Sequence, residues 1–125
     1  MQSDGIAVEQ ADEDLMVVVV EGEHDIYTAP VLRERLGRAA EGARGLVVDL
    51  TATTFLDSTV LGVLLDARRR AHEAGAGFAV CLGEEVHPGV QRIFDVTGLV
   101  PVLPVVRGRE AALSSAGGAA AREQA

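Results

Sequence analysis

Two residues that can bond or react stand together in the segment FLDSTVLGVLL, which runs from Phe55 to Leu65. Asp57 supplies a carboxylate and Ser58 a hydroxyl, directly before an apolar run with helical spacing. A serine in this position can cap a helix, attack a substrate, or accept a phosphate from a partner enzyme. The role of Ser58 decides most of what the sequence says about function.

A nucleophilic role for Ser58 finds little support. A serine hydrolase needs a base beside the nucleophile, and the histidines are His24, His72 and His87. His72 lies four turns along the same predicted helix, about 21 Å away. The DST sequence also lacks the G-x-S-x-G elbow. We therefore predict that the chain is not an enzyme. Capping by Asp57 or Ser58 is favoured by spacing, and capping leaves room for a second role.

Other residues with possible chemistry are better explained as structural. Asp49 ends the segment GLVVD, as a phosphoacceptor of a receiver domain would, but receivers also use a lysine and this sequence has none. Cys81 is the single cysteine, which excludes an internal disulfide, and its apolar neighbours place it in the core. No His or carboxylate pair has metal-ligand spacing. We expect neither a metal nor a cofactor.

Composition limits the partners. The 125 residues are enough for one domain, and 48% are hydrophobic. The net charge of −8 disfavours binding to nucleic acid and to anionic membrane surfaces. No apolar stretch approaches the roughly 18 residues that span a bilayer. The acidic N-terminus lacks the basic flank of a signal peptide, and a lone cysteine fits a reducing compartment. These features predict a cytoplasmic protein.

The order of predicted elements indicates an α/β fold. Two strands surround an acidic turn at 11–14, and strands then alternate with helices. The later strands are predicted at 45–51, 77–83 and 100–106, and the helices at 27–43, 58–74 and 87–98. We expect the last strand at a sheet edge, because it contains Pro101 and Pro104, which cannot donate ladder hydrogen bonds.

This alternation predicts a mixed, mainly parallel sheet with an N-terminal hairpin and helices packed on it. The domain spans 1–107, and 108–125 is predicted to be a weakly structured or disordered tail. The carboxyl ends of parallel strands bring Asp25 and Ser58 to one edge.

The predicted helix after Asp57 has two distinct faces. Its core face holds apolar residues at helical spacing: Val60, Val63, Leu64, Ala67, Ala71 and Ala74. The face of Ser58 carries Gly62 and Leu65, with Leu61 at its border. Leucines on this side are explained either by a neighbouring segment that covers them or by a contact patch for a partner.

Three segments in order resemble STAS-domain anti-sigma factor antagonists. The segment FLDSTVLGVLL resembles their D-S-x-G-L-G stretch. The segment VVVVEGEHDIYTAPVLRERL resembles their G-E-x-D-x-x-T-A strand-to-helix segment. The segment VQRIFDVTGLVPVLPV resembles their late I-F-x-x-T-G-L segment. The similarity covers about residues 6–106. Val60 stands where the family usually has glycine, and His24 where an apolar residue is common.

The resemblance implies a partner switch. The unmodified form would bind an anti-sigma factor that is also a serine kinase, freeing a sigma factor, and phosphorylation of Ser58 would end binding until a serine phosphatase reverses it. The implied contact residues are Asp25, Asp57, Ser58, Thr59, Leu61, Gly62 and Leu65. The free protein is expected to be a monomer or a weak dimer. The alternative is a STAS module in a scaffold or sensor complex without a phospho-switch.

Overall fold

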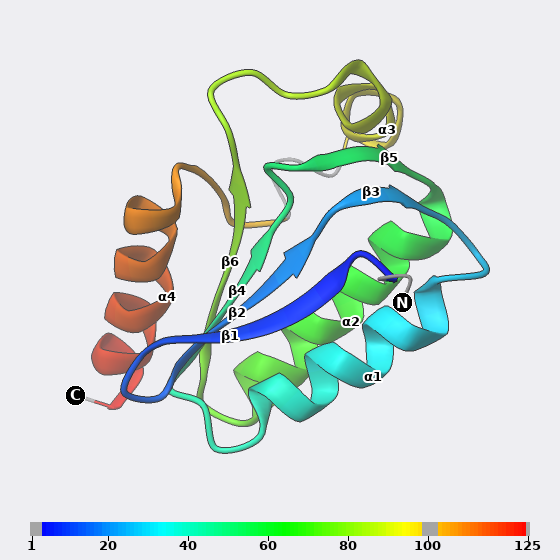
Figure 1. Cartoon of the computed structure of the whole chain (residues 1–125). Coiled ribbons are helices and arrows are strands. Elements are labelled where there is room, and N and C mark those ends of the chain that lie inside the picture. Colours follow the sequence, from blue (N-terminus) through cyan, green and yellow to red (C-terminus); the bar gives the residue numbers. More distant parts are fainter. Residues whose placement is uncertain (1–3, 99–102, 125) are drawn as a thin grey trace.

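The computed structural model describes residues 4–98 and 103–124. Figure 1 shows the order of the elements along the chain. The strands are β1 (Ile6–Asp12), β2 (Leu15–Val20), β3 (Gly22–His24), β4 (Gly45–Asp49), β5 (Thr53–Leu56), β6 (Gly77–Leu82) and β7 (Val105–Arg107). The helices are α1 (Ala29–Ala40), α2 (Ser58–Glu73), α3 (Pro88–Thr97) and α4 (Arg109–Gln124).

The main sheet has five strands in the order β1-β2-β4-β6-β7. β1 is antiparallel to β2, and the other neighbours are parallel. This confirms the predicted mainly parallel sheet with an N-terminal hairpin. β7 lies at the edge, where the proline-containing segment was predicted, although Pro101 lies outside the described residues. β4 and β6 are buried along their whole length, because helices cover both of their faces.

A second, two-stranded parallel sheet pairs β3 with β5. Sequence analysis missed both strands, because three or four residues are too few to establish a period. Gly22 begins β3 at a φ of 84°, a conformation that glycine adopts readily, and its N–H donates to the carbonyl of Ala52 at 3.0 Å. In this small sheet β3 continues the path of β2 and β5 continues that of β4 (Figure 1). The segments that precede α1 and α2 therefore start from neighbouring strands.

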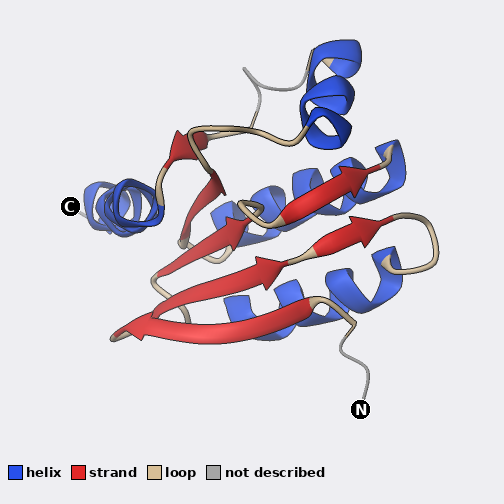
Figure 2. Cartoon of the chain, turned by 45° about the horizontal axis from the view of Figure 1, so that its top comes forward, coloured by secondary structure: helices blue, strands red, loops and turns tan. Residues whose placement is uncertain are grey.

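Helices cover the main sheet on both faces. α1 and α2 lie on one face and α4 on the other, as Figure 2 shows. The larger core lies under α1 and α2, and includes Leu32, Leu36 and Leu64. The smaller cluster under α4 consists of Val17, Val47, Ala79, Cys81, Ala112 and Ala116. Cys81 is therefore a core residue, as predicted. Its burial, and next the Asp49 carboxylate, raise the pKa of its thiol.

Helix α4 corrects the prediction of a weakly structured tail. Ala112 and Ala116 are fully buried, and a Cβ atom added at Gly77 would lie 1.7 Å from the Ala116 carbonyl oxygen. The helix backbone thus lies directly on β6. This segment lacks a clear amphipathic pattern, because small alanines rather than large apolar residues make the contact with the sheet. Alanine is nevertheless the strongest helix former.

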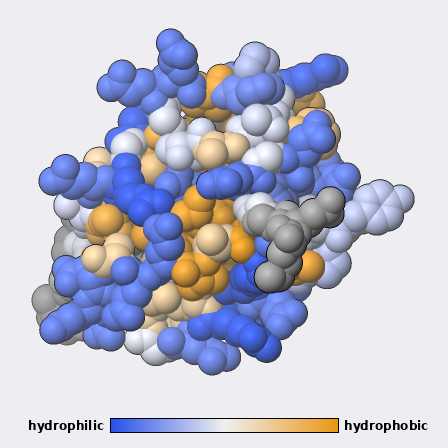
Figure 3. Space-filling model, in the orientation of Figure 1, coloured by the Kyte–Doolittle hydropathy of each residue, from blue (hydrophilic) through white to orange (hydrophobic). Residues whose placement is uncertain are grey.

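Asp49 fixes the start of α4 to the sheet. Its carboxylate is 4% exposed, accepts from the Thr51 N–H and hydroxyl at 2.9 and 2.7 Å, and pairs with Arg109 at 3.0 Å. Arg109 also pairs with Glu9 of β1 at 2.8 Å. A buried carboxylate needs such partners. Asp49 is thus a structural residue, as predicted. Val19 and Val106 pack against the cluster under α4 and are only partly buried. Figure 3 shows the surface of the molecule, with hydrophobic residues near the middle of the view and hydrophilic residues around them.

The contact between α4 and β6 predicts a large cost for any side chain at Gly77. Gly77→Ala is expected to lower the free energy of unfolding by about 2 kcal/mol or more, because the added methyl group has no room. Urea denaturation measures this loss. Gly118→Ala is the matched control, since a Cβ there meets nothing within 4 Å. Equal stability of the two variants would contradict this placement of α4.

Candidate functional site

The Asp57 carboxylate connects the start of α2 to the segment before α1. Its Oδ1 accepts from the Val60 N–H at 3.0 Å, which is the helix cap, and its Oδ2 accepts from the Ile26 N–H at 3.1 Å. The predicted capping role therefore belongs to Asp57. In the described part of the chain no hydrogen bond engages the Ser58 hydroxyl, and the residue is exposed. Ser58 is thus free for another role.

Asp25 shapes the loop beside Ser58. Its Oδ1 accepts from the Tyr27 N–H at 2.9 Å, and its carbonyl accepts from the Thr28 and Ala29 N–H groups at 3.1 and 2.9 Å. Thr28 occupies the predicted cap position of α1, but its side chain makes no cap hydrogen bond. Its hydroxyl instead accepts from the Asp25 N–H at 3.0 Å. The loop is therefore held from within as well as by Asp57.

His24 is a structural residue beneath this loop. Its side chain is 1% exposed, its Nε2 donates to the Glu21 carbonyl at 2.8 Å, and its Nδ1 lies 3.1 Å from the Thr28 hydroxyl. Both ring nitrogens thus have partners, which explains how a polar side chain is accommodated in a buried position.

The predicted core and surface faces of α2 are only partly confirmed. Leu61 is 1% exposed and belongs to the core cluster, so its predicted place on the partner surface is wrong. That cluster also holds Val90, Phe94 and Leu103, which follow β6 in the chain. The alternative in which neighbouring segments cover the leucines therefore applies to Leu61. Leu65 is half-buried against the same cluster.

The two ends of α2 also bear on the predictions. Ala74, predicted in the core, is exposed because it lies after the last helical turn. Val60, which stands where the resembling family has glycine, points into the core with its N–H bonded to Asp57. The helix begins at Ser58 with its cap formed. Val60 therefore does not displace the start of α2.

The residues that remain accessible form a compact group at one end of the molecule. Ser58, Thr59 and Gly62 are exposed on α2, and a Cβ added at Gly62 would meet nothing within 4 Å. Ile26 and Tyr27 are 60% and 86% exposed on the loop that Asp57 holds. We call these five residues the switch surface.

Sequence reasoning missed Ile26 and Tyr27. A large apolar side chain in a loop has no periodic neighbours that reveal its exposure. The available signal was that Tyr27 is the only tyrosine and lies two residues after Asp25. Large apolar side chains held in the open by a hydrogen-bonded loop often belong to a contact surface.

The charge around the switch surface is negative. Asp25 and Asp57 accept backbone hydrogen bonds, and within residues 4–98 and 103–124 neither forms an ion pair with an arginine. The N-terminus of α2 contributes a partial positive charge, and the Asp57 carboxylate already interacts with it as the helix cap. A second anion at Ser58 would therefore face two carboxylates.

Two further searches of the described residues bear on the class of site. None of the helices in this part of the chain combines the length and apolarity needed to cross a bilayer. The same residues hold no group of three or more His, Cys, Asp or Glu side chains arranged to bind a metal ion.

Known proteins resemble this chain over most of its length. The model of the STAS domain family matches residues 6–112. The anti-sigma-B factor antagonist of Bacillus subtilis (strain 168) is 33% identical over 100 residues, which cover 80% of this chain and 88% of the relative. An anti-sigma factor antagonist from Mycobacterium paratuberculosis has a similar crystal structure, with a TM-score of 0.76 and 32% identity over 89% of this chain and 92% of that one. The unphosphorylated antagonist SpoIIAA shares the fold, with a TM-score of 0.70 and 24% identity over 90% of this chain and 96% of that one.

The double role of Asp57 predicts an unusual response to asparagine. Asparagine caps helices about as well as aspartate, but its side chain has only one acceptor oxygen. Asp57→Asn should therefore keep hydrogen-exchange protection at one of the Val60 and Ile26 amides and lose it at the other. Asp57→Ala should lose both and destabilise the fold by about 1 kcal/mol.

Asp95→Ala is the control for this experiment, since Asp95 is exposed and, among the described residues, its side chain bonds only that of Gln91. If Asp57→Ala leaves protection of the Ile26 amide unchanged, Asp57 does not hold the loop.

Proposed function

Because the chain belongs to the STAS domain family, we propose that it is an anti-sigma factor antagonist controlled by phosphorylation of Ser58. In its unphosphorylated form it binds an anti-sigma factor that is also a serine kinase, and this releases a sigma factor. Phosphate on Ser58 ends binding, and a serine phosphatase restores it. The cycle takes place in the cytoplasm, and the free protein is a monomer or a weak dimer. The antagonist names of its relatives support this function.

The observation that carries the proposal is that Asp57, and not Ser58, caps helix α2. Asp57 satisfies the helix cap, so the adjacent hydroxyl is exposed and uncommitted at the first position of α2. A kinase can reach such a hydroxyl without unfolding the domain. A phosphate there is compatible with the fold, because a helix N-terminus favours an anion.

Charge explains how one phosphate can end binding. The group adds about −1.5 to −2 charges at pH 7. Asp25 and Asp57 lie in the same surface without arginine partners in the described chain, so the added charge is not neutralised internally. A partner matched to the unmodified surface would have to desolvate the phosphate. A loss of about 3 kcal/mol would weaken binding more than a hundredfold.

The apolar residues of the switch surface supply affinity. Tyr27 and Ile26 are large and exposed, and hydrogen bonds hold their backbone N–H groups, so the loop loses little backbone freedom on binding. Gly62 allows a close approach to α2. We propose that the partner contacts are Asp25, Asp57, Ser58, Thr59, Gly62 and the exposed edge of Leu65, together with Ile26 and Tyr27.

Ser58 is expected to be the only hydroxyl that the kinase modifies. The partner is first isolated from the native cell by affinity capture and identified by mass spectrometry. Incubation with this kinase and ATP should place phosphate on Ser58, and Ser58→Ala should take up none while binding as the wild type does. Ser58→Asp should fold normally and bind at least tenfold more weakly, a loss of about 1.4 kcal/mol.

The same experiment separates the alternatives. Phosphate on Thr59 would move the modified position by one residue. A partner that binds but phosphorylates no hydroxyl would rule out the phospho-switch and favour the alternative, a STAS module in a scaffold or sensor complex.

The position of Gly62 gives a clean test of the contact surface. Gly62→Arg projects into solvent and should weaken binding of the captured partner at least tenfold without lowering the melting temperature. Gly62→Ala is the matched control: it should bind nearly normally and stabilise α2 by roughly 0.5–1 kcal/mol. Tyr27→Ala should also weaken binding, and Val96→Ala, on the exposed face of α3, should not. Normal binding by Gly62→Arg and Tyr27→Ala would place the contact elsewhere.

A further inference from the structure

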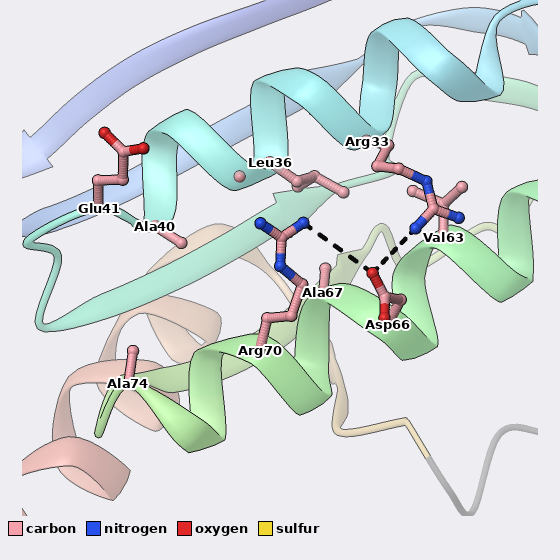
Figure 4. A pocket seen from close by; sticks show the side chains of 10 residues that line it. Arg33, Leu36, Ala40, Glu41, Val63, Asp66, Ala67, Arg70 and Ala74 are labelled. Carbon is pink, nitrogen blue, oxygen red and sulfur yellow. Dashed lines mark hydrogen bonds and ion pairs between the residues drawn. The ribbon is translucent and has the colours of Figure 1, made fainter.

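A pocket of about 170 Å³ opens between α1 and α2 (Figure 4). Its apolar lining comes from Leu36, Ala40, Val63, Ala67 and Ala74. The volume resembles that of a cavity of about 150 Å³ that takes up benzene. Arg70, which lines the pocket, is about 18 Å along α2 from Ser58. The Arg70 end of the pocket thus lies away from Ser58, and the pocket has room for about six carbon atoms.

Charged side chains of both signs lie at the rim of the pocket. The Asp66 carboxylate accepts from Arg33 at 3.0 Å and from Arg69 at 2.5 Å, and Arg70 lies 4.0 Å from it. The hydrogen bond from Arg69, assisted by the charges of Arg33 and Arg70, holds the pKa of Asp66 below its ordinary value. Glu73 pairs with Arg69. The lining itself has two guanidinium groups, those of Arg33 and Arg70, and two carboxylates, those of Glu41 and Asp66.

Arg70 has unused hydrogen-bonding capacity. Figure 4 shows its guanidinium reaching from α2 towards α1, across the pocket. In the described chain its only ion pair is the long one to Asp66, and none of its N–H groups donates a hydrogen bond. Most N–H groups of this fork thus face the pocket or solvent.

The guanidinium of Arg70 lies against Gly37 of α1. A Cβ added at Gly37 would lie 3.4 and 3.6 Å from the two terminal nitrogens of Arg70, which is an ordinary contact distance. The two helices thus come close together at this end of the pocket.

We propose that this pocket binds a small monocarboxylate of about six carbons in all, with an unbranched apolar tail. The planar guanidinium of Arg70 accommodates a carboxylate through two parallel hydrogen bonds. The tail lies on Leu36, Ala67 and Ala74, where it displaces water from apolar surface. Glu41 and Asp66 at the two ends of the pocket disfavour a second negative charge on the ligand.

Titration of the full chain with hexanoate, followed by amide NMR shifts, tests this site. Saturable shifts are expected at Gly37, Ala67 and Ala74, with acetate and 1-hexanol each binding at least tenfold more weakly. Arg70→Gln should weaken hexanoate binding at least tenfold. Arg68→Gln is the matched control, since Arg68 is exposed on the same helix but does not line this pocket, and it should bind as the wild type does.

Three results would overturn the proposal. The first is equal binding of hexanoate and 1-hexanol, which would indicate apolar binding without an anion site. The second is normal hexanoate binding by Arg70→Gln. The third is a set of amide shifts that do not saturate or that lie away from the pocket. Ala40→Leu fills the apolar lining and should abolish binding. Its melting temperature is measured beside the wild type, so that loss of binding is not confused with unfolding.

Discussion

The two hydrogen bonds accepted by the Asp57 carboxylate determine the geometry of the candidate site. One bond starts α2, and the other holds the loop between β3 and α1 against that start. Segments that are 31 residues apart in sequence thereby become one surface. The position of Ile26 and the freedom of the Ser58 hydroxyl depend on this one carboxylate, and Asp25 adds a hydrogen bond to Tyr27.

This arrangement also explains why a switch at Ser58 need not change the fold. The cap is provided by the preceding residue, so chemistry at the hydroxyl breaks no hydrogen bond of the described domain. The acidic neighbours raise the cost of an added phosphate for a partner without disturbing the core beneath. Val60 and Leu61, directly below the surface, are almost fully buried and hold the first turn of α2 in place.

The main sheet, α1 and α2 could be predicted because their apolar residues are large and recur with a clear period. A helix cap at Asp57 or Ser58 was recognisable because caps depend on local chemistry, and the structure assigns it to Asp57. Leu61 was misplaced because helical geometry gives the angle of a side chain but not the number of segments that pack around the helix. Helix α4 was missed because Ala112 and Ala116 reach the sheet only where Gly77 leaves space, and that match spans distant parts of the chain. The exposure of Tyr27 likewise follows from the loop's hydrogen bonds to Asp25 and Asp57.

The separate two-stranded sheet has a consequence for how such a protein can diversify. β3 and β5 carry the loops of the switch surface, whereas the five-stranded sheet and its helices contain most of the buried apolar residues. Side chains on those loops can therefore change with little loss of thermodynamic stability. A duplicated gene could acquire a new binding preference by altering Ile26, Tyr27 and their neighbours while retaining the same scaffold. Related antagonists in one cell could thus be kept from cross-reacting by differences confined to a few loop positions.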